Sequence, residues 1–216
     1  MDNQVYLRVC ETFTSLQGEG LHSGLPFFFI RLTGCNLRCN YCDTAYAWSE
    51  GKVRTVRELI SLWQESGLRH VLITGGEPLI HEGTYVLMDA LLKKGATVLL
   101  ETNGSISLAR VNRQIVKVVD WKTPGSGSGS SFLLENLRYI QRRDQIKFVI
   151  TSEQDYKWAQ RLVRKRSLTL FTTVLFSPCH GRVEPNELAS WILKDRLEVR
   201  LQLQLHKVLW GDQRGF

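Results

Sequence analysis

The sequence predicts an α/β protein built on a mostly parallel sheet, and three observations support this fold class. Predicted strands and helices alternate along most of the 216 residues, which is typical of parallel strands joined by helical crossovers. The segment Pro26–Leu32 is almost continuously apolar, as expected of a strand covered on both faces. Several polar or glycine-rich segments directly follow predicted strands, at the edge where parallel sheets hold their active sites.

The number of strand–helix units favours an open barrel. We count about six units, too few for a closed eight-stranded barrel. We therefore predict a partial (β/α)6 barrel with small N- and C-terminal extensions, and a doubly wound open sheet is the alternative. The Gly/Ser-rich run at 125–131 resembles an interdomain linker. Because the alternation continues across it, we interpret it as an active-site loop and expect a single domain over residues 1–216.

Strands are placed where apolar and β-branched residues form short runs bounded by turn residues. They are expected at Val5–Phe13, Pro26–Leu32, Arg69–Thr74, Thr97–Thr102, Ile115–Trp121, Gln145–Thr151, Leu168–Phe176 and Val199–Gln204. The turn-rich segment Leu-Gln-Gly-Glu-Gly at 16–20 separates the first two strands. A cysteine-rich loop follows the second.

Helices are placed by the signals at their ends. Thr55-Val-Arg-Glu58 is a capping box that starts a helix, and Gly95 is a C-terminal cap for the next one. The expected helices are Thr55–Ser66, the segment that ends at Lys94, Phe132–Arg142, the segment capped by Ser152, and the segment that begins at Pro185.

The composition is that of a folded globular protein. Hydrophobic residues make up 43% and charged residues 23%, which argues against disorder. The longest apolar stretch, Leu25–Ile30, is too short to span a bilayer, so we expect no membrane partner. The first residues lack the charged and apolar parts of a secretory signal, so we expect a cytoplasmic location.

The basic charge balance is read as a solvated surface. Lys and Arg total 28 against 21 Asp and Glu, giving a net charge of +7. Such a balance suits an anionic substrate or nucleic acid. The basic residues are spread along the chain, and the dense run Arg161–Arg166 falls in a predicted amphipathic helix whose charges face water. We expect no direct nucleic-acid partner.

Three of the five cysteines, Cys35, Cys39 and Cys42, form a CxxxCxxC motif just after the second strand. Thiolates packed this closely indicate a metal or cluster site. Structural zinc usually takes four ligands in paired spacings, and no second CxxC is present. Candidates for a fourth zinc ligand are His81, Cys179, His180 and His206. An iron–sulfur cubane on three thiolates instead leaves one iron open to a small molecule.

These motifs resemble the radical S-adenosylmethionine (SAM) superfamily. CxxxCxxC after Pro26–Leu32, the first core strand, with Tyr41 before the last cysteine, is similar to the cluster signature of this superfamily. Gly75-Gly-Glu-Pro78 is similar to its second landmark. The resemblance implies a partial barrel of the radical SAM type, a [4Fe-4S] cluster, and SAM bound through its amino and carboxylate groups to the open iron. It also implies that an electron from the cluster cleaves SAM to a 5′-deoxyadenosyl radical.

A narrower resemblance, to the 7-carboxy-7-deazaguanine synthases, runs over nearly the whole chain. It is carried by Leu16–Gly20, Phe29–Cys35, Cys42-Asp-Thr44, Thr74–Pro78, Glu101-Thr-Asn-Gly104 and Leu203–Lys207. It implies the radical ring contraction of 6-carboxy-5,6,7,8-tetrahydropterin to 7-carboxy-7-deazaguanine with release of ammonia, on the route to queuosine and other 7-deazapurines. It also implies a homodimer and an electron donor such as flavodoxin or ferredoxin.

The resemblance also implies roles for individual residues. Cys35, Cys39 and Cys42 would hold the cluster; Tyr41, Asp43, Gly76, Glu101 and Lys122 would contact SAM; Leu16, Gln17, Gly18, Glu19, Arg31, Thr74, His206 and Phe216 would contact the pterin; and Thr44 would bind Mg²⁺. Many relatives have Ser-Pro-Lys where this chain has Asp120-Trp-Lys122, so only the lysine is carried over there.

Several of these side chains could instead have a purely structural role. Arg31 lies in an apolar strand and must face a carboxylate, either the substrate's or an internal one such as Glu19. Glu19 is either a turn carboxylate or an acceptor for the guanidine-like pterin edge. Glu101 either caps a strand or meets SAM. His206 is either structural or substrate-orienting. Cys10 and Cys179 are most simply core thiols.

A second function is a glycyl-radical-enzyme activase acting on a protein partner. Such activases commonly carry additional ferredoxin-like cysteine sets, which this chain lacks. The 16–20 segment and Leu-His-Lys at 205–207 favour the small-molecule enzyme.

Overall fold

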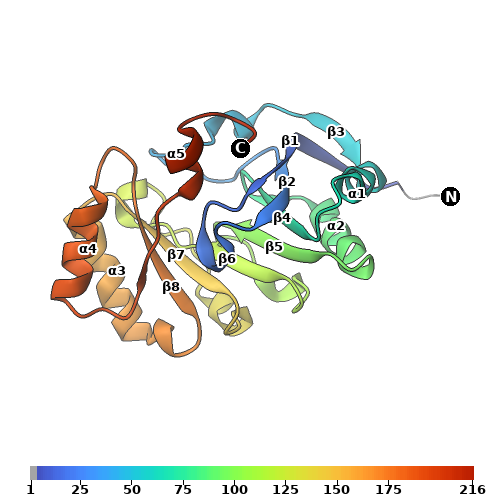
Figure 1. Cartoon of the computed structure of the whole chain (residues 1–216). Helices are drawn as coiled ribbons and strands as arrows, with labels where there is room; N and C mark the ends of the chain where they lie inside the picture. Colours follow the sequence, from blue (N-terminus) through green and yellow to red (C-terminus); the bar gives the residue numbers. More distant parts are fainter. Residues whose placement is uncertain (1–3) are drawn as a thin grey trace.

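The computed structural model describes residues 4–216 and forms one nine-stranded sheet in the order β3-β1-β2-β4-β5-β6-β7-β8-β9 (Figure 1). Its strands are β1 (Tyr6–Leu16), β2 (Pro26–Leu32), β3 (Lys52–Thr55), β4 (His70–Gly75), β5 (Thr97–Thr102), β6 (Val116–Asp120), β7 (Gln145–Ile150), β8 (Thr173–Pro178) and β9 (Arg200–Leu201). Its α-helices are α1 (Val56–Glu65), α2 (Glu82–Lys93), α3 (Glu153–Arg166), α4 (Pro185–Lys194) and α5 (Leu205–Trp210).

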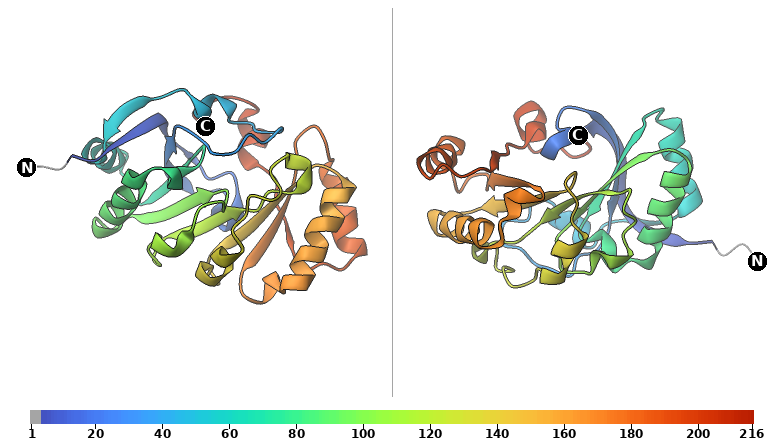
Figure 2. Two further views of the ribbon diagram at one scale, coloured as in Figure 1. Left: turned by 180° about the vertical axis from the view of Figure 1, so that it is seen from behind. Right: turned by 90° about the horizontal axis from the view of Figure 1, so that it is seen from below.

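The strand order identifies an open partial barrel rather than a doubly wound sheet. From β2 to β9, apart from β3, each strand pairs in parallel with the next one in the chain, without the reversal that defines a doubly wound sheet. β1 and β3 add an antiparallel N-terminal extension. Figure 2 shows the curved sheet with α1 and α2 towards one end and α3 and α4 towards the other, while α5 stands apart. The predicted fold class is therefore confirmed.

Apolar side chains cover both faces of the central strands. One cluster lies between the sheet and the helices and includes Ile30, Ile73 and Phe148, each fully buried. A smaller cluster closes the inner, concave face at one end of the strands; it consists of Phe27, Phe29, Leu72, Leu99 and Val116, with Phe13 against it. Burial on two faces explains the nearly continuous apolar sequence of β2.

Helix α1 begins as its sequence predicts. The Thr55 hydroxyl accepts a hydrogen bond from the Glu58 backbone N–H, and the Glu58 carboxylate accepts one from the Thr55 N–H. This capping box contributes about 1 kcal/mol to the helix. Its buried residues Leu59 and Trp63 are four apart and face the sheet.

Two predicted elements are wrong in type or extent. Phe132–Arg142 contains only a 3₁₀ segment, Leu134–Tyr139, because the buried Asn136 side chain bonds to three neighbouring backbone groups and holds the chain as a loop. The strand expected at Leu168–Phe176 begins only at Thr173, because Ser167 adopts φ 50° and starts a 3₁₀ turn.

The sheet edges also differ from expectation. The last strand is reduced to Arg200–Leu201, and β1 continues to Leu16, beyond its predicted end. Neither β3 nor α5 was predicted. Both are short and partly exposed, so neither has a strong apolar period.

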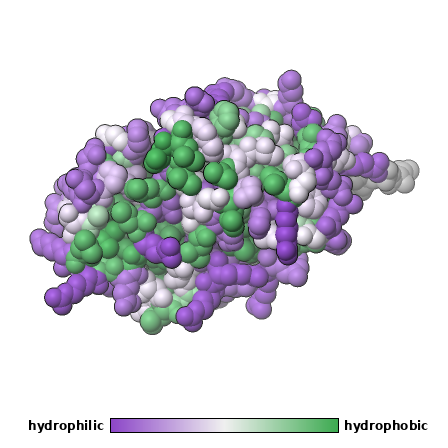
Figure 3. Space-filling view, in the orientation of Figure 1, coloured by the Kyte–Doolittle hydropathy of each residue, from purple (hydrophilic) through white to green (hydrophobic). Residues whose placement is uncertain are grey.

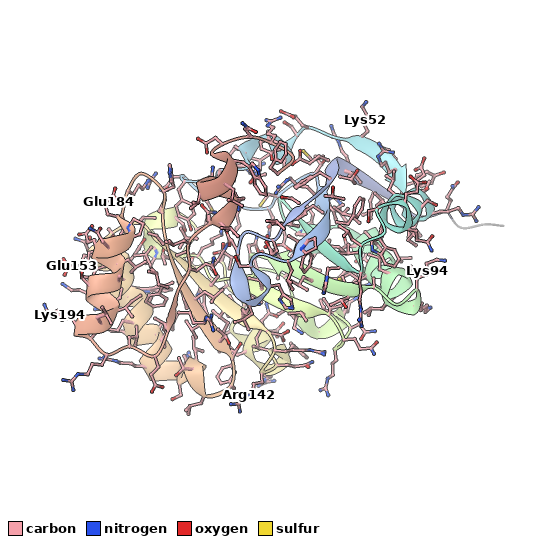
Figure 4. The ribbon with its side chains drawn as sticks, viewed as in Figure 1. Lys52, Lys94, Arg142, Glu153, Glu184 and Lys194 are labelled. Carbon is pink, nitrogen blue, oxygen red and sulfur yellow. The ribbon has the colours of Figure 1, made fainter. Side chains whose placement is uncertain are left out.

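Charged side chains of both signs lie on the exterior of the molecule (Figure 4). Charged side chains project outward from separate elements around the molecule, as labelled in Figure 4 for Lys52, Lys94, Arg142, Glu153, Glu184 and Lys194. Within residues 4–216, no helix combines the length and the apolar character needed to cross a membrane.

Candidate active site

A single cavity of about 660 Å³ brings all the predicted site residues together. It lies at the carboxyl ends of the parallel strands, where the loops after β2, β4, β5, β6 and β8 meet. Its lining includes Leu16, Gln17, Gly18, Glu19, Arg31, Cys35, Cys39, Tyr41, Cys42, Asp43, Thr44, Thr74, Gly76, Glu101, Lys122, His206 and Phe216.

The floor of the cavity follows from strand periodicity. Side chains two positions apart on a strand point to the same face. The residues that follow Phe29, Leu72, Leu99 and Gln145 by two places are Arg31, Thr74, Glu101 and Lys147, and all four line the cavity. On β2, β4 and β5, the apolar side chains of the smaller cluster are thus followed, two residues further along, by polar or charged side chains that line the cavity.

The three-cysteine loop follows β2 and has little regular structure. Cys35, Cys39 and Cys42 are partly buried free thiols that all line the cavity. Within residues 4–216, no three His, Cys, Asp or Glu side chains converge closely enough to hold one metal ion. A single zinc needs such convergence, whereas a cubane distributes its thiolates over separate irons. The three thiols, on one loop that lines the cavity, suit such a cubane.

The Gly75-Gly76-Glu77 turn is packed directly against this loop. Gly75 has φ 138°, and a Cβ on Gly76 would overlap the Gly34 carbonyl oxygen and lie 2.8 Å from the Cys35 Cβ. The Gly76 backbone therefore forms part of the cavity wall beside the cysteines. Only glycine leaves room for this approach.

Glu77 makes its hydrogen bonds to other residues of the protein interior. Its carboxylate is fully buried and accepts hydrogen bonds from the Leu79 N–H (3.0 Å), the Thr102 hydroxyl (2.8 Å) and the Asn103 N–H (2.7 Å). Burial raises its pKa despite these donors. Glu77 thereby ties the loop after β4 to the loop after β5, and the Asn103 amide in turn donates to the Asn36 side chain (3.1 Å) in the cysteine loop.

Glu101 lies with residues predicted to contact the substrate, although it was predicted to contact SAM. It accepts hydrogen bonds from the Thr74 hydroxyl (2.8 Å) and from the Gln17 amide (3.5 Å). Burial raises its pKa, and Lys147 opposes that rise.

The loop at residues 17–19 is held by the C-terminal segment. The Leu205 N–H donates to the Gly18 carbonyl (2.9 Å), and Gly18 is packed so closely on the His206 ring that a Cβ would overlap it. Gln17 is only 3% exposed. Helix α5 was not predicted, yet it places His206 against the loop that the sequence singled out.

The internal partner of Arg31 is Glu11, and the suggestion of Glu19 was wrong. Arg31 Nε lies 2.7 Å from Glu11 Oε1, and Glu11 also accepts a hydrogen bond from the Tyr46 hydroxyl (3.0 Å). The guanidinium carbon is 5.7 Å from the centre of the Phe13 ring. Because these contacts come from β1 and the 45–48 segment, Arg31 is fixed in place while still lining the cavity.

Asp120 and Lys147 are cavity residues that the sequence analysis did not assign. Asp120 Oδ2 is 3.0 Å from Lys122 Nζ and 3.3 Å from Lys147 Nζ, and Lys147 Nζ is 2.6 Å from Glu19 Oε2. Burial alone would raise the pKa of Asp120, but the two ammonium groups hold it below its usual value. A lysine between Ile146 and Phe148 is a signal of the same kind as Arg31 in its apolar strand.

Two further predicted residues, Thr44 and Phe216, line the cavity with side chains that are at least partly exposed. The Thr44 hydroxyl donates to Asp43 Oδ1 (2.8 Å), so two oxygen donors stand side by side. Phe216 is half exposed and packs on Trp210, and the whole segment 211–216 lines the cavity. Arg214 fixes this segment by pairing with Glu50 (3.0 Å).

Comparisons with known proteins agree on one kind of relative. Residues 29–119 match the family model of the radical SAM superfamily. The 7-carboxy-7-deazaguanine synthase of Koribacter versatilis is 42% identical over 96% of this chain and 98% of its own length. That of Chlorobaculum tepidum is 38% identical over 100% of both chains. The crystal structure of QueE from Escherichia coli matches with a TM-score of 0.77 at 25% identity, over 92% of this chain and 94% of that one.

Proposed function

Since this chain belongs to the 7-carboxy-7-deazaguanine synthase family of radical SAM enzymes, we propose that it converts 6-carboxy-5,6,7,8-tetrahydropterin to 7-carboxy-7-deazaguanine with release of ammonia. The product leads to queuosine and other 7-deazapurines. The activase alternative is not favoured, because the relatives that match this chain over its length carry the synthase name.

One observation carries the proposal: the cysteine loop and the 17–19 loop line the same cavity. A radical generated from SAM is useful only where the substrate lies against it, so both sites must share one enclosed space. Gly76 packs against Cys35 of the cysteine loop, and Arg31 and Thr74 are paired neighbours on β2 and β4 that line the same cavity.

The residues present fit a [4Fe-4S] cluster and SAM. Cys35, Cys39 and Cys42 would hold the cluster through three thiolates, leaving one iron for SAM. Tyr41, Asp43, Gly76 and Lys122 would surround SAM. When bound, the cluster supplies the electron that cleaves SAM. The chain itself contributes the shape of the cavity, the placement of the substrate and the exclusion of water.

The test is anaerobic incubation of the reconstituted protein with SAM, dithionite and carboxytetrahydropterin, followed by mass spectrometry. We expect 7-carboxy-7-deazaguanine and 5′-deoxyadenosine. Formation of 5′-deoxyadenosine alone would leave a radical SAM enzyme whose substrate is not this pterin.

Arg31 is proposed to bind the substrate carboxylate. Its Nε is engaged by Glu11, which orients the guanidinium, and the side chain lines the cavity. A guanidinium binds a carboxylate through two parallel hydrogen bonds, which an ammonium group cannot reproduce.

Arg31→Lys is therefore expected to weaken pterin binding by roughly 1–3 kcal/mol while SAM binding stays nearly unchanged. Equilibrium titration of each ligand measures the two effects separately. If pterin affinity were intact and only the melting temperature fell, Arg31 would serve the ion pair with Glu11 and nothing more.

Magnesium is proposed as a second metal at Thr44. The paired oxygens of Thr44 and Asp43 at the cavity wall fit a hard cation, which accepts few protein ligands and keeps waters. When bound, the ion would stabilise negative charge on substrate oxygens as a Lewis acid.

Thr44→Ala, or chelation of magnesium, is expected to slow product formation by roughly tenfold or more, while cleavage of SAM by dithionite persists. Rates of 7-carboxy-7-deazaguanine and 5′-deoxyadenosine formation, measured in the same reaction, separate the two steps. Equal product rates with magnesium and with excess chelator would remove the metal from the mechanism.

We further propose a homodimer, a flavodoxin or ferredoxin as electron donor, a cytoplasmic location, and one domain for the whole chain, without direct nucleic-acid or membrane partners. Support for an interface comes from exposed apolar side chains over and beside α5, where Figure 3 shows a hydrophobic patch. They are Leu201, Leu203, Val208 and Leu209. Patches of this kind commonly mark protein interfaces.

A further inference from the structure

Lys147 is a buried charge in the cavity that the proposed ligand assignment does not use. Its side chain is only 12% exposed, and its ammonium group contacts Glu19 (2.6 Å) and Asp120 (3.3 Å). A buried ammonium ion persists only where partners compensate for its lost hydration. Here the two carboxylates come from different parts of the site: Glu19 from the 17–19 loop, and Asp120 from the end of β6 beside Lys122.

The two carboxylates differ in how fully they are engaged. Glu19 Oε2 is held by Lys147 and Glu19 Oε1 by the Gln204 amide (2.7 Å), so the orientation of the group is fixed. Asp120 Oδ2 is shared by Lys147 and Lys122, and Asp120 Oδ1 is buried without a partner. Lys147 therefore contacts both Glu19, in the part of the cavity assigned to the substrate, and Asp120, in the part assigned to SAM.

Electrostatics explains why a cation is needed at this position. Glu19, Asp120 and Glu101 all face one cavity, and buried carboxylates that share a site repel one another. Burial would lower the pKa of Lys147, but Glu19, Asp120 and Glu101 raise it well above its usual value, so the group stays charged. Without Lys147, Glu19 would lose the contact that holds its Oε2 atom, and Asp120 would keep only its contact with Lys122.

We propose that Lys147 is a positioning residue that holds Glu19 oriented to accept hydrogen bonds from the amino-pyrimidine edge of the substrate. This inference rests on the proposed function, because the pterin supplies the N–H donors. It assigns Lys147 an effect on substrate binding that passes through Glu19, and no direct contact with SAM is required.

The test measures binding of carboxytetrahydropterin and of SAM separately, by anaerobic titration. Lys147→Met is expected to weaken pterin binding by about tenfold or more and SAM binding by less than about threefold. Lys147→Arg, which retains the charge, should restore most of the affinity.

A double-mutant cycle shows whether the effect passes through Glu19. In the Glu19→Gln background, Lys147→Met should cost less than about threefold in pterin affinity. An undiminished effect there would mean that Lys147 contacts the substrate itself, and wild-type affinity in Lys147→Met would mean that it has no part in binding. Either result overturns the proposal.

Lys117→Met is the matched control. Lys117 is also buried, more deeply than Lys147, and is paired with Asp144 (2.8 Å), but it does not line the cavity. It should lower the melting temperature without changing pterin affinity. If Lys147→Met does not fold, Lys147→Gln replaces it, with the same expected loss of affinity. If wild-type protein does not bind the pterin, the proposed function fails first, and this inference fails with it.

Discussion

Replacing Cys39 with alanine is expected to abolish the iron–sulfur cluster and all product formation. Cys39 is one of the three thiols of the 35–42 loop that line the cavity, and the fourth cavity-lining thiol, Cys179, lies outside this loop, directly after β8. Wild-type protein prepared without oxygen should be brown and contain about four irons per chain. The variant should lose the sulfur-to-iron charge-transfer absorption and nearly all of its iron, both measurable on the purified protein without any substrate.

Cys10→Ala provides the control for this change. Cys10 lies on β1 and does not line the cavity, so the variant should keep its iron and its colour. Stoichiometric zinc without iron in wild-type protein purified without oxygen would contradict the cluster assignment. Retention of about four irons in Cys39→Ala would show that another residue supplies the third ligand.

The sequence predicted the location of the site well because a parallel sheet places the ends of its strands at one edge. Glu101 and Lys122 are far along the chain from the cysteine loop, yet Glu101 lies at the end of β5, Lys122 lies just after β6, and both line the same cavity. Such residues are found by locating strands and turns, without knowledge of any side-chain contact.

The partners of the charged residues could not be predicted in this way. Arg31 was expected to need a carboxylate, but whether Glu11 or Glu19 meets it depends on the register of the antiparallel β1–β2 pair. In that register Glu11 is directly opposite Arg31. Glu19 is drawn away by Lys147, a residue more than a hundred positions along the chain. Local patterns carry no information about such pairings.

Short elements stabilised by tertiary contacts were missed for a related reason. Helix α5 has no fully buried residue, and its position depends on the Leu205 bond to Gly18. The loop around Leu134–Tyr139 has the apolar content of a helix, but Asn136 bonds to the backbone of the 104–108 segment and overrides the local preference. In both cases the chain is fixed by groups distant in sequence.

Gly76→Ala is expected to be the most damaging single-methyl change to SAM binding. The added Cβ would overlap the Gly34 carbonyl oxygen, and backbone atoms cannot rotate out of the way. Two hydrogen bonds hold the strands' ends at this point: Gly76 N–H to the Leu32 carbonyl (3.2 Å) and Glu77 N–H to the Gly34 carbonyl (2.8 Å). The methyl group must therefore push the cysteine loop and the Gly76 wall apart by roughly 1 Å or more to reach ordinary contact distance.

Because the cysteines themselves are unchanged, Gly76→Ala should retain much of its iron but bind SAM about a hundredfold more weakly, a loss of roughly 2.7 kcal/mol. SAM titration of the reconstituted protein, with iron analysis and thermal unfolding of the same sample, measures each effect. Gly67→Ala is the matched control, since Gly67 has φ 67° with open space around it and lies outside the cavity. It should lose about 1 kcal/mol of stability through backbone strain and keep its affinity for SAM. Wild-type SAM affinity in Gly76→Ala would mean that this turn does not form the wall against which SAM binds.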